Sequence, residues 1–377
     1  MQRFDLSLNI KLTDSAFKRL VVLSSLLFSM HAEALVLLQQ ASASFGTDYD
    51  DNPTMADTNK TTVMRYSFNP KYNISAVDDI NTWFASAGLN VQRSSNKNIT
   101  IDRDDPNFNF GWTRALERGS FGLNASYSKA STRITEIDES GRVLRDGDST
   151  TKSIGANFTH LITERLSINS GAQYLKKDFS VGNFTGYTSK SLNTGLSYQL
   201  TEKISPFAQV SWTDYKSEGL TAIDRKSQNY SAGANFILSL RLNYGLSAGI
   251  SHVENTGNGR IYGANATYLG DRYNLKASLG RSISPSSLGG FQESDNLSIG
   301  YGYELSAISR FGADISWRRN NSFNDSESGS VSGFYSRDLT EYWQMRLSAR
   351  HRTLKTINNS AEGNSAGITF TYNIPEF

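Results

Sequence analysis

The chain contains no cysteine and only 6 prolines among its 377 residues, and its 38 basic side chains nearly balance 36 acidic ones. Without cysteine there can be no disulfide framework and no cysteine-ligated zinc, iron–sulfur or thiol chemistry. A formal net charge of +2 gives no reason to expect nucleic acid as a partner. The mean hydropathy is −0.44, and no later segment offers the roughly 20 apolar residues that a membrane-spanning helix needs. These features exclude a bundle of transmembrane helices.

What the chain does contain is aromatic residues and glycine. Aromatic side chains make up 11 % of the sequence, and there are 30 glycines. Disordered chains are poor in aromatics, so general disorder is excluded. Abundant Tyr and Phe together with Asn, Ser and Gly suit a sheet that has one apolar and one polar face.

The first 34 residues have the pattern of a secretory signal peptide. Lys18 and Arg19 precede a short apolar run, Leu20–Met30, and Ala32 and Ala34 fit a small-x-small cleavage site. The run is too short to span a bilayer, which takes about 20 residues. We therefore expect residues 1–34 to be removed on export, leaving residues 35–377 as the mature protein.

From residue 41 onward, apolar and polar residues alternate with a period of two. In Leu242–Ser251, one set of alternate positions is Leu, Tyr, Leu, Ala and Ile, and the other is Asn, Gly and Ser. Asn296–Leu305, Phe121–Tyr127 and Ala366–Ile374 repeat this arrangement. A period of two places alternate side chains on opposite faces of a strand, and helical spacing fails on these segments. The pattern predicts β-strands.

About eighteen such segments follow one another along the chain. They start near residues 41, 63, 82, 106, 120, 151, 165, 188, 204, 227, 241, 260, 272, 295, 308, 328, 341 and 364. Short connections alternate with longer polar ones, among them 49–61, 94–105, 130–150, 253–259, 283–294 and 353–363. Outer-membrane barrels have this alternation, with short periplasmic turns and long extracellular loops. We predict an all-β fold for residues 35–377: a closed antiparallel transmembrane barrel of about 18 strands, with 16 to 20 allowed, and both termini in the periplasm.

Aromatic residues gather near the ends of the apolar face. Aromatic belts mark the two interfaces of a membrane with water. The tryptophans predicted for these belts are Trp83, Trp112, Trp212, Trp317 and Trp343. We expect a Gram-negative outer-membrane location, with outer-membrane lipid and lipopolysaccharide as partners. The terminal Phe377, at the end of an alternating strand, resembles the signal that the barrel assembly machinery reads.

Several charges fall on the predicted lumen face. The basic candidates are Arg65, Lys71, Lys276, Arg310, Arg318, Arg346, Arg350 and Arg352, and their acidic partners are Asp314 and Glu304. Rings of Arg and Lys in a pore favour anions, so one interpretation is a basic stripe along which an acidic or sugar-rich solute slides. The other, which the nearby carboxylates favour, is cross-strand ion pairing that keeps the lumen wet.

Two polar segments allow more than one interpretation. The loop 130–150 could fold inward as a constriction, although a solvated hairpin extension with a turn at Ser140–Gly141 is the favoured reading. The cluster Asp48, Asp50 and Asp51 could supply oxygen ligands to Ca²⁺, but a turn in an outer loop is favoured there. No other metal site and no cofactor is expected.

An enzymatic function is not expected. The mature chain has His160, His252 and His351. His160 follows Thr159 and His252 follows Ser251 on strands, where adjacent side chains point to opposite faces, so neither pair forms a dyad. The chain also lacks the HExxH, G-x-S-x-G and phosphate-binding glycine motifs.

The segment Phe45–Pro53, which contains Tyr-Asp-Asp-Asn, resembles the opening strand of the β-barrel porin 2 type encoded with exopolysaccharide systems. The turns at Leu161–Leu166, Leu200–Ile204 and Leu339–Trp343 are similar to those of the same group. This resemblance implies an outer-membrane channel for polysaccharide secretion, with polysaccharide and periplasmic export components as partners. It implies no catalytic residues.

Three functions follow from these patterns. The first is a channel for passage or secretion of exopolysaccharide or an anionic saccharide. The second is a general diffusion porin for small solutes, and the third is a non-conducting scaffold or surface-receptor barrel.

Overall fold

The computed structural model describes residues 35–140, 143, 145–218, 223–321, 325–357 and 359–374. The proposed leader, residues 1–34, and the proposed assembly signal, Phe377, lie outside this described part. The described residues form 18 strands and one helix. The strands are β1 (Val36–Asp50), β2 (Val63–Val77), β3 (Asn81–Ser94), β4 (Arg103–Leu116), β5 (Gly119–Ser131), β6 (Asp148–Leu161), β7 (Leu166–Phe179), β8 (Tyr187–Tyr198), β9 (Ile204–Ser217), β10 (Asp224–Ser239), β11 (Leu242–Val253), β12 (Gly257–Leu269), β13 (Tyr273–Ser286), β14 (Gly290–Ser306), β15 (Ser309–Asn320), β16 (Ser326–Asp338), β17 (Trp343–Thr356) and β18 (Asn359–Ile374). The helix, α2, spans Thr132–Ser140.

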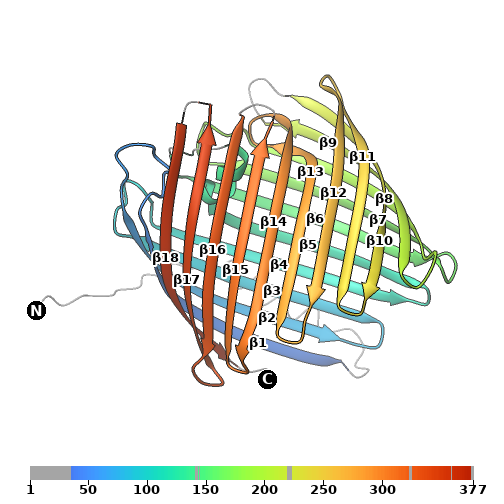
Figure 1. The fold of residues 1–377 in the computed structure, drawn as a ribbon, viewed down its shortest axis with the longest axis horizontal. Helices are drawn as coiled ribbons and strands as arrows, with labels where there is room; N and C mark the ends of the chain where they lie inside the picture. Colours follow the sequence, from blue (N-terminus) through green and yellow to red (C-terminus); the bar gives the residue numbers. More distant parts are fainter. Residues whose placement is uncertain are drawn as a thin grey trace, which may run out of the picture. The chain divides into compact units, whose positions relative to one another are not determined.

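The described residues from Leu37 onward form one compact unit, in which each strand pairs with its sequence neighbours to make an antiparallel barrel. The barrel closes where β1 pairs with β18, in a register that runs from Ala41 opposite Ile374 to Asp50 opposite Ser365 (Figure 1). Closure leaves no free strand edge, which is a requirement in lipid because every backbone polar group must be paired. The predicted fold class is confirmed, and so is the strand number.

The two faces of the barrel have opposite character. Large apolar side chains that alternate outward are widely exposed, for example Ile154 at 58 % and Leu192 at 51 %. The inward positions between them are Ser, Asn, Gly and Thr, and hydroxyls on neighbouring strands bond across the ladder, as Ser126 does with Ser153 at 2.7 Å. An apolar outer belt and a polar interior are what a barrel in lipid needs. The described helix is not long and apolar enough to cross a membrane.

At the periplasmic end the turns are short and fixed by local side chains. Thr163 Oγ1 accepts the N–H of Leu166, and Thr340 Oγ1 accepts that of Trp343 in the same way. Asp78 Oδ1 accepts the N–H groups of Ile80 and Asn81. Such hydroxyl and carboxylate caps substitute for ladder bonds where the chain reverses, which explains the recurrence of Leu-Thr-Glu at these points.

At the extracellular end several strands are longer than the alternation predicts. The connections expected at 253–259, 283–294 and 353–363 are much shorter than predicted. For example, β11 ends at Val253 and β12 begins at Gly257, and β13 ends at Ser286 and β14 begins at Gly290. The prediction of long loops was wrong at these three places. Strand segments above the membrane meet water on both faces, so their sequence does not need an apolar set of alternate residues.

Candidate functional site

The strand register separates the lumen face from the lipid face. On β15 and β17, Ser316 and Arg350 line an interior cavity, so the residues that alternate with them face lipid. The predicted basic residues Arg310, Arg318, Arg346 and Arg352 lie an even number of residues from Ser316 or Arg350 on the same strands, and so they face the lumen too. Lys276 belongs to the same face. It lies opposite Gly300, which lies opposite Asp314, and Asp314 is two residues from Ser316 on β15 and so also faces the lumen.

Helix α2 folds into the barrel mouth instead of extending into solvent. Glu136 is fully buried, with the ammonium of Lys177 on β7 at 2.6 Å and Ser287 Oγ donating to it at 2.6 Å. The Arg133 guanidinium is also buried and donates to the carbonyl oxygens of Ile99 and Val143, at 2.7 and 3.3 Å. The favoured sequence interpretation, a solvated hairpin extension, was therefore wrong for this segment, while the turn expected at Ser140–Gly141 lies partly outside the described residues. The alternative that the sequence left open, an inward constriction, is the one that these contacts support.

The connection between β1 and β2 also turns inward. The fully buried Asn52 side chain accepts the N–H of Ala56 and donates to the carbonyl oxygens of Ala56 and Glu362, at 2.8, 2.7 and 2.9 Å. Met55 then packs in a buried cluster with Leu354 and Ala361, against which Ile137 of α2 lies. The first and last strands and the helix are thus held together at the mouth.

A third inward segment, the tight turn between β13 and β14, covers the other side of the mouth. Tyr215 on β9 is fully buried and its hydroxyl donates to the carbonyl oxygen of Ser286 at 3.1 Å. Tyr187, Val253 and Phe291 pack with it in one apolar cluster. Because Ser287 of this turn bonds to Glu136, the turn and α2 meet inside the mouth.

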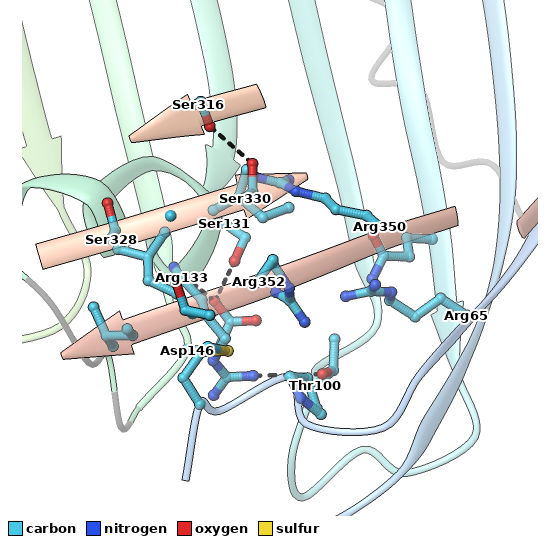
Figure 2. Close-up of a pocket in the computed structure, with 18 residues that line it drawn as sticks. Arg65, Thr100, Ser131, Arg133, Asp146, Ser316, Ser328, Ser330, Arg350 and Arg352 are labelled. Atoms are coloured by element: carbon cyan, nitrogen blue, oxygen red, sulfur yellow. Dashed lines mark hydrogen bonds between the residues drawn. The ribbon is translucent and has the colours of Figure 1, made fainter. Parts of the chain in front are cut away.

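Beside these inward segments lies a cavity of about 140 Å³, lined largely by arginine and hydroxyl side chains. Arg350 and Arg352 enter it from β17, and Arg65 enters from β2 (Figure 2). Arg350 donates to Ser330 Oγ at 3.2 Å, and Ser330 bonds to Ser316 at 2.8 Å. We call the set Arg65, Arg350 and Arg352 the arginine cluster.

Two carboxylates hold part of this cluster in place. Asp50 is fully buried and accepts from Arg352 at 2.7 Å and from Arg65 at 3.1 Å, while Asp48 pairs closely with Arg65. Asp51 accepts both the backbone N–H and the side-chain amide of Asn364, at 2.6 and 2.8 Å. Asp48, Asp50 and Asp51 therefore bind cationic and amide groups of the chain, and no cluster of metal-ligating side chains is found in the part of the chain that is described.

Charges at the mouth shift the pKa values of groups outside the strands. Burial lowers the pKa of the Arg133 guanidinium below its ordinary value; Asp146 opposes this shift, and the positive charge of Arg65 adds to it. Burial alone would raise the pKa of the Asp51 carboxyl, but the hydrogen bonds from Asn364 hold it below 3.8. Guanidinium and carboxylate groups therefore lie side by side at this end of the barrel.

The other predicted basic residues lie elsewhere along the lumen. The Arg346 guanidinium lies 3.7 Å from the ring centroid of Phe334, and Arg318 donates to Asn320 and Ser294 at 3.0 and 3.2 Å. Lys71 lines a second hollow, of about 210 Å³, together with Gln40 and Phe84.

The acidic residues expected to pair with these arginines are Glu304 and Asp314. The ladder places Glu304 opposite Arg310, and Asp314 opposite Gly300 and Ser332. Arg65 and Arg352 instead form ion pairs with Asp48 and Asp50, which the sequence analysis did not consider as acceptors.

The predicted interface tryptophans alternate with lumen residues and so face outward. Trp83 and Trp112 lie opposite each other near the periplasmic end, and Trp343 packs on the Tyr372 ring at 5.1 Å at the same end. Trp317 lies near the extracellular end, where its indole N–H donates to Glu327 at 2.7 Å. Trp212 lies on β9, opposite Leu192.

No family model matches the chain, and no curated protein matches it by sequence. Solved structures do resemble it. OpdO of Pseudomonas aeruginosa has a TM-score of 0.51 and 11 % identity, covering 90 % of this chain and 97 % of that one. OccAB4 of Acinetobacter baumannii has a TM-score of 0.50 and 12 % identity, covering 90 % and 98 %. A mutant of the ferric enterobactin receptor PfeA of P. aeruginosa has a TM-score of 0.51 and 7 % identity, covering 89 % and 80 %.

At these identities the likeness concerns the fold. The matched proteins share the closed barrel fold with this chain, and one of them is a ferric enterobactin receptor. The resemblance agrees with the apolar belt, the closed ladder and the polar lumen of this chain. The protein is an outer-membrane β-barrel.

Proposed function

We propose that the barrel is a channel through which exopolysaccharide or another anionic saccharide crosses the outer membrane. The observation that carries this proposal is the arginine cluster, which lines a cavity together with residues of the inward segments. Arginine presents a planar fork of donors suited to carboxylate and phosphate groups, and basic residues that line a pore favour anions.

The opposite wall of the lumen supports a saccharide as the solute. The lumen positions of β8 to β11 are mainly Ser, Thr, Asn, Gln and Gly. The side-chain amide oxygens of Asn235 and Asn265 both lie close to Gly245, where an added Cβ would come within 2.7 Å of each. One wall thus offers amides and hydroxyls for sugar hydroxyls, and the other offers guanidinium groups for acid groups.

Single-channel conductance of the refolded protein in a planar bilayer tests the proposal, with and without an acidic oligosaccharide. We expect open channels that the oligosaccharide blocks, and relief of this block by Arg346→Ala with Arg350→Ala. Lys203→Ala, in the β9-side periplasmic turn, removes a positive charge away from the lumen and should leave the block unchanged.

Two alternatives give different results in this experiment. Open channels indifferent to the oligosaccharide would identify a general diffusion porin, for which the many small neutral lumen residues are suited. A complete lack of conductance would sink both channel proposals. The three inward segments seen in the described residues would then favour a plugged scaffold or surface-receptor barrel.

We also propose partners and processing steps for this channel. Residues 1–34 would direct export as a cleaved signal peptide, and Phe377 would be read by the barrel assembly machinery. Saccharide secretion would further require periplasmic export components. Sequencing the N-terminus of the membrane-inserted protein tests the first point, since Leu35 should be the first residue.

A further inference from the structure

Lysines gather on the outer surface of β6, β7 and β8, facing the membrane. Lys177 points inward to Glu136, so its neighbour Lys176 points outward. The register sets Lys152 directly opposite Lys176, and it sets Lys190 opposite Tyr174 in the next row of the same face. We call Lys152, Lys176 and Lys190 the lysine patch.

The patch lies at the level of the extracellular aromatic belt. Tyr127 lies opposite Lys152 and Tyr174 opposite Lys190, and aromatic rings of this kind mark the height of lipid headgroups. Directly below, toward the middle of the membrane, the same face is apolar: Ile154 lies two residues from Lys152, and Leu192 lies two residues from Lys190. Positive charge therefore stands above a surface suited to acyl chains.

The charges of the patch are only partly neutralised by the protein. Lys176 pairs with Glu218 at 2.7 Å and with Asp178 at 3.5 Å. Within the described residues, no carboxylate lies within 4.0 Å of the ammonium group of Lys152 or Lys190, although Asp214 is the ladder neighbour of Lys190. Two lysines directly opposite each other on one face of a sheet repel, and an anion between them removes that cost.

We propose that the lysine patch binds the phosphate groups of a phosphorylated outer-leaflet glycolipid of the lipid A type. The Lys152 and Lys190 ammonium groups contact the phosphates, and the acyl chains lie on Ile154, Leu192 and the ring of Tyr174. This site is on the outer face of the barrel, so it stands independently of any solute in the lumen.

Native mass spectrometry in detergent, with added bis-phosphorylated lipid A, measures the binding. The variant is Lys152→Gln with Lys190→Gln. The matched control is Lys71→Gln with Lys276→Gln, which removes the same charge from the lumen face. We expect wild type and control to bind alike and the patch variant to bind roughly 30-fold more weakly, as two lost lysine–phosphate contacts imply.

Equal binding by wild type and the patch variant would overturn the proposal, as would equal binding of dephosphorylated lipid A or phosphatidylglycerol. A second measurement uses the wild-type protein alone, in case the variant does not fold. Raising the salt concentration should weaken lipid A binding, because exposed charge pairs are screened. Binding that is insensitive to salt would also overturn it.

Discussion

The ion pair between Glu136 and Lys177 holds α2 inside the barrel mouth, and its removal is the most direct test of how the opening is built. Glu136 is fully buried and the side chain of Lys177 is 12 % exposed, with 2.6 Å between carboxylate oxygen and ammonium nitrogen. The substitution Glu136→Ala leaves this ammonium without its partner and also removes the acceptor of Ser287. The helix then loses both of these ties, one to β7 and one to the β13–β14 turn.

The size of the effect follows from the burial of the pair. Breaking one partner of a buried ion pair costs about 3–5 kcal/mol, because the remaining charge is left uncompensated. Lys177 retains its contact with the Phe179 ring, 5.3 Å from the ring centroid, so the lower end of this range applies. About 3 kcal/mol corresponds to roughly a 100-fold increase in the ratio of open to closed positions of α2.

Single-channel recordings should therefore show a larger or more frequently fluctuating conductance for Glu136→Ala than for wild type. Hydrogen exchange should become faster in α2, while the strand amides should keep their protection. The reversed pair, Glu136→Lys with Lys177→Glu, tests the ion pair itself and should recover part of the wild-type behaviour. Glu202→Ala, in an exposed periplasmic turn, is the matched control and should change neither measurement. Unchanged exchange in α2 of Glu136→Ala would refute this reasoning.

Three further results are expected. The double variant Arg346→Ala with Arg350→Ala should reduce the channel's preference for anions. In a salt gradient, its reversal potential should shift toward the value for cation preference. An unchanged reversal potential would show that these arginines do not set selectivity. Asn52→Ala should lower the local stability of the β1–β2 connection by about 1–3 kcal/mol, because buried backbone groups lose their hydrogen-bond partner. Limited proteolysis should then cut residues 51–62 faster than in wild type. Equal cutting rates would show that Asn52 does not hold this connection in place. The Lys97 ammonium, with the N–H of Ser94, holds the pKa of the Asp102 carboxyl below 3.8. A lowered folded-state pKa means that this stabilisation is complete above about pH 4 and is lost as the pH falls below 3.8. The protection factors of the amides of residues 95–102, which correct the exchange rate for the pH dependence of intrinsic exchange, should therefore fall between about pH 4 and about pH 3 in wild type but not in Asp102→Asn, and an equal fall in both would contradict the assignment.

The barrel could be predicted from the sequence because its signal is local and repeated. A segment such as Leu242–Ser251 specifies a strand and two faces without reference to the rest of the chain. The strand ends at the extracellular side were placed less well. There β13 and β14 leave the membrane, so lipid no longer demands an apolar set at alternate positions.

The mouth could not be predicted because its contacts join distant parts of the chain. The buried Glu136 accepts a hydrogen bond from Ser287, 151 residues away in the sequence, and the buried Asp50 accepts one from Arg352, 302 residues away. Nothing in the local pattern of Thr132–Ser140 distinguishes a buried acidic helix from a solvated one. The Asp-rich segment raised the same difficulty, since carboxylates suited to a cation also suit an arginine.

The seam between β1 and β18 has a consequence for the order of events during insertion. Asp50 and Asp51 belong to the first strand and the residue that follows it, whereas Arg352 and Asn364 belong to the last two strands. A barrel whose first and last strands have not yet met cannot set Arg352 against Asp50, and so has no complete arginine cluster. Under the proposed function, selection between solutes should thus arise only when β1 pairs with β18. A barrel that has not yet closed would pass solutes without selectivity.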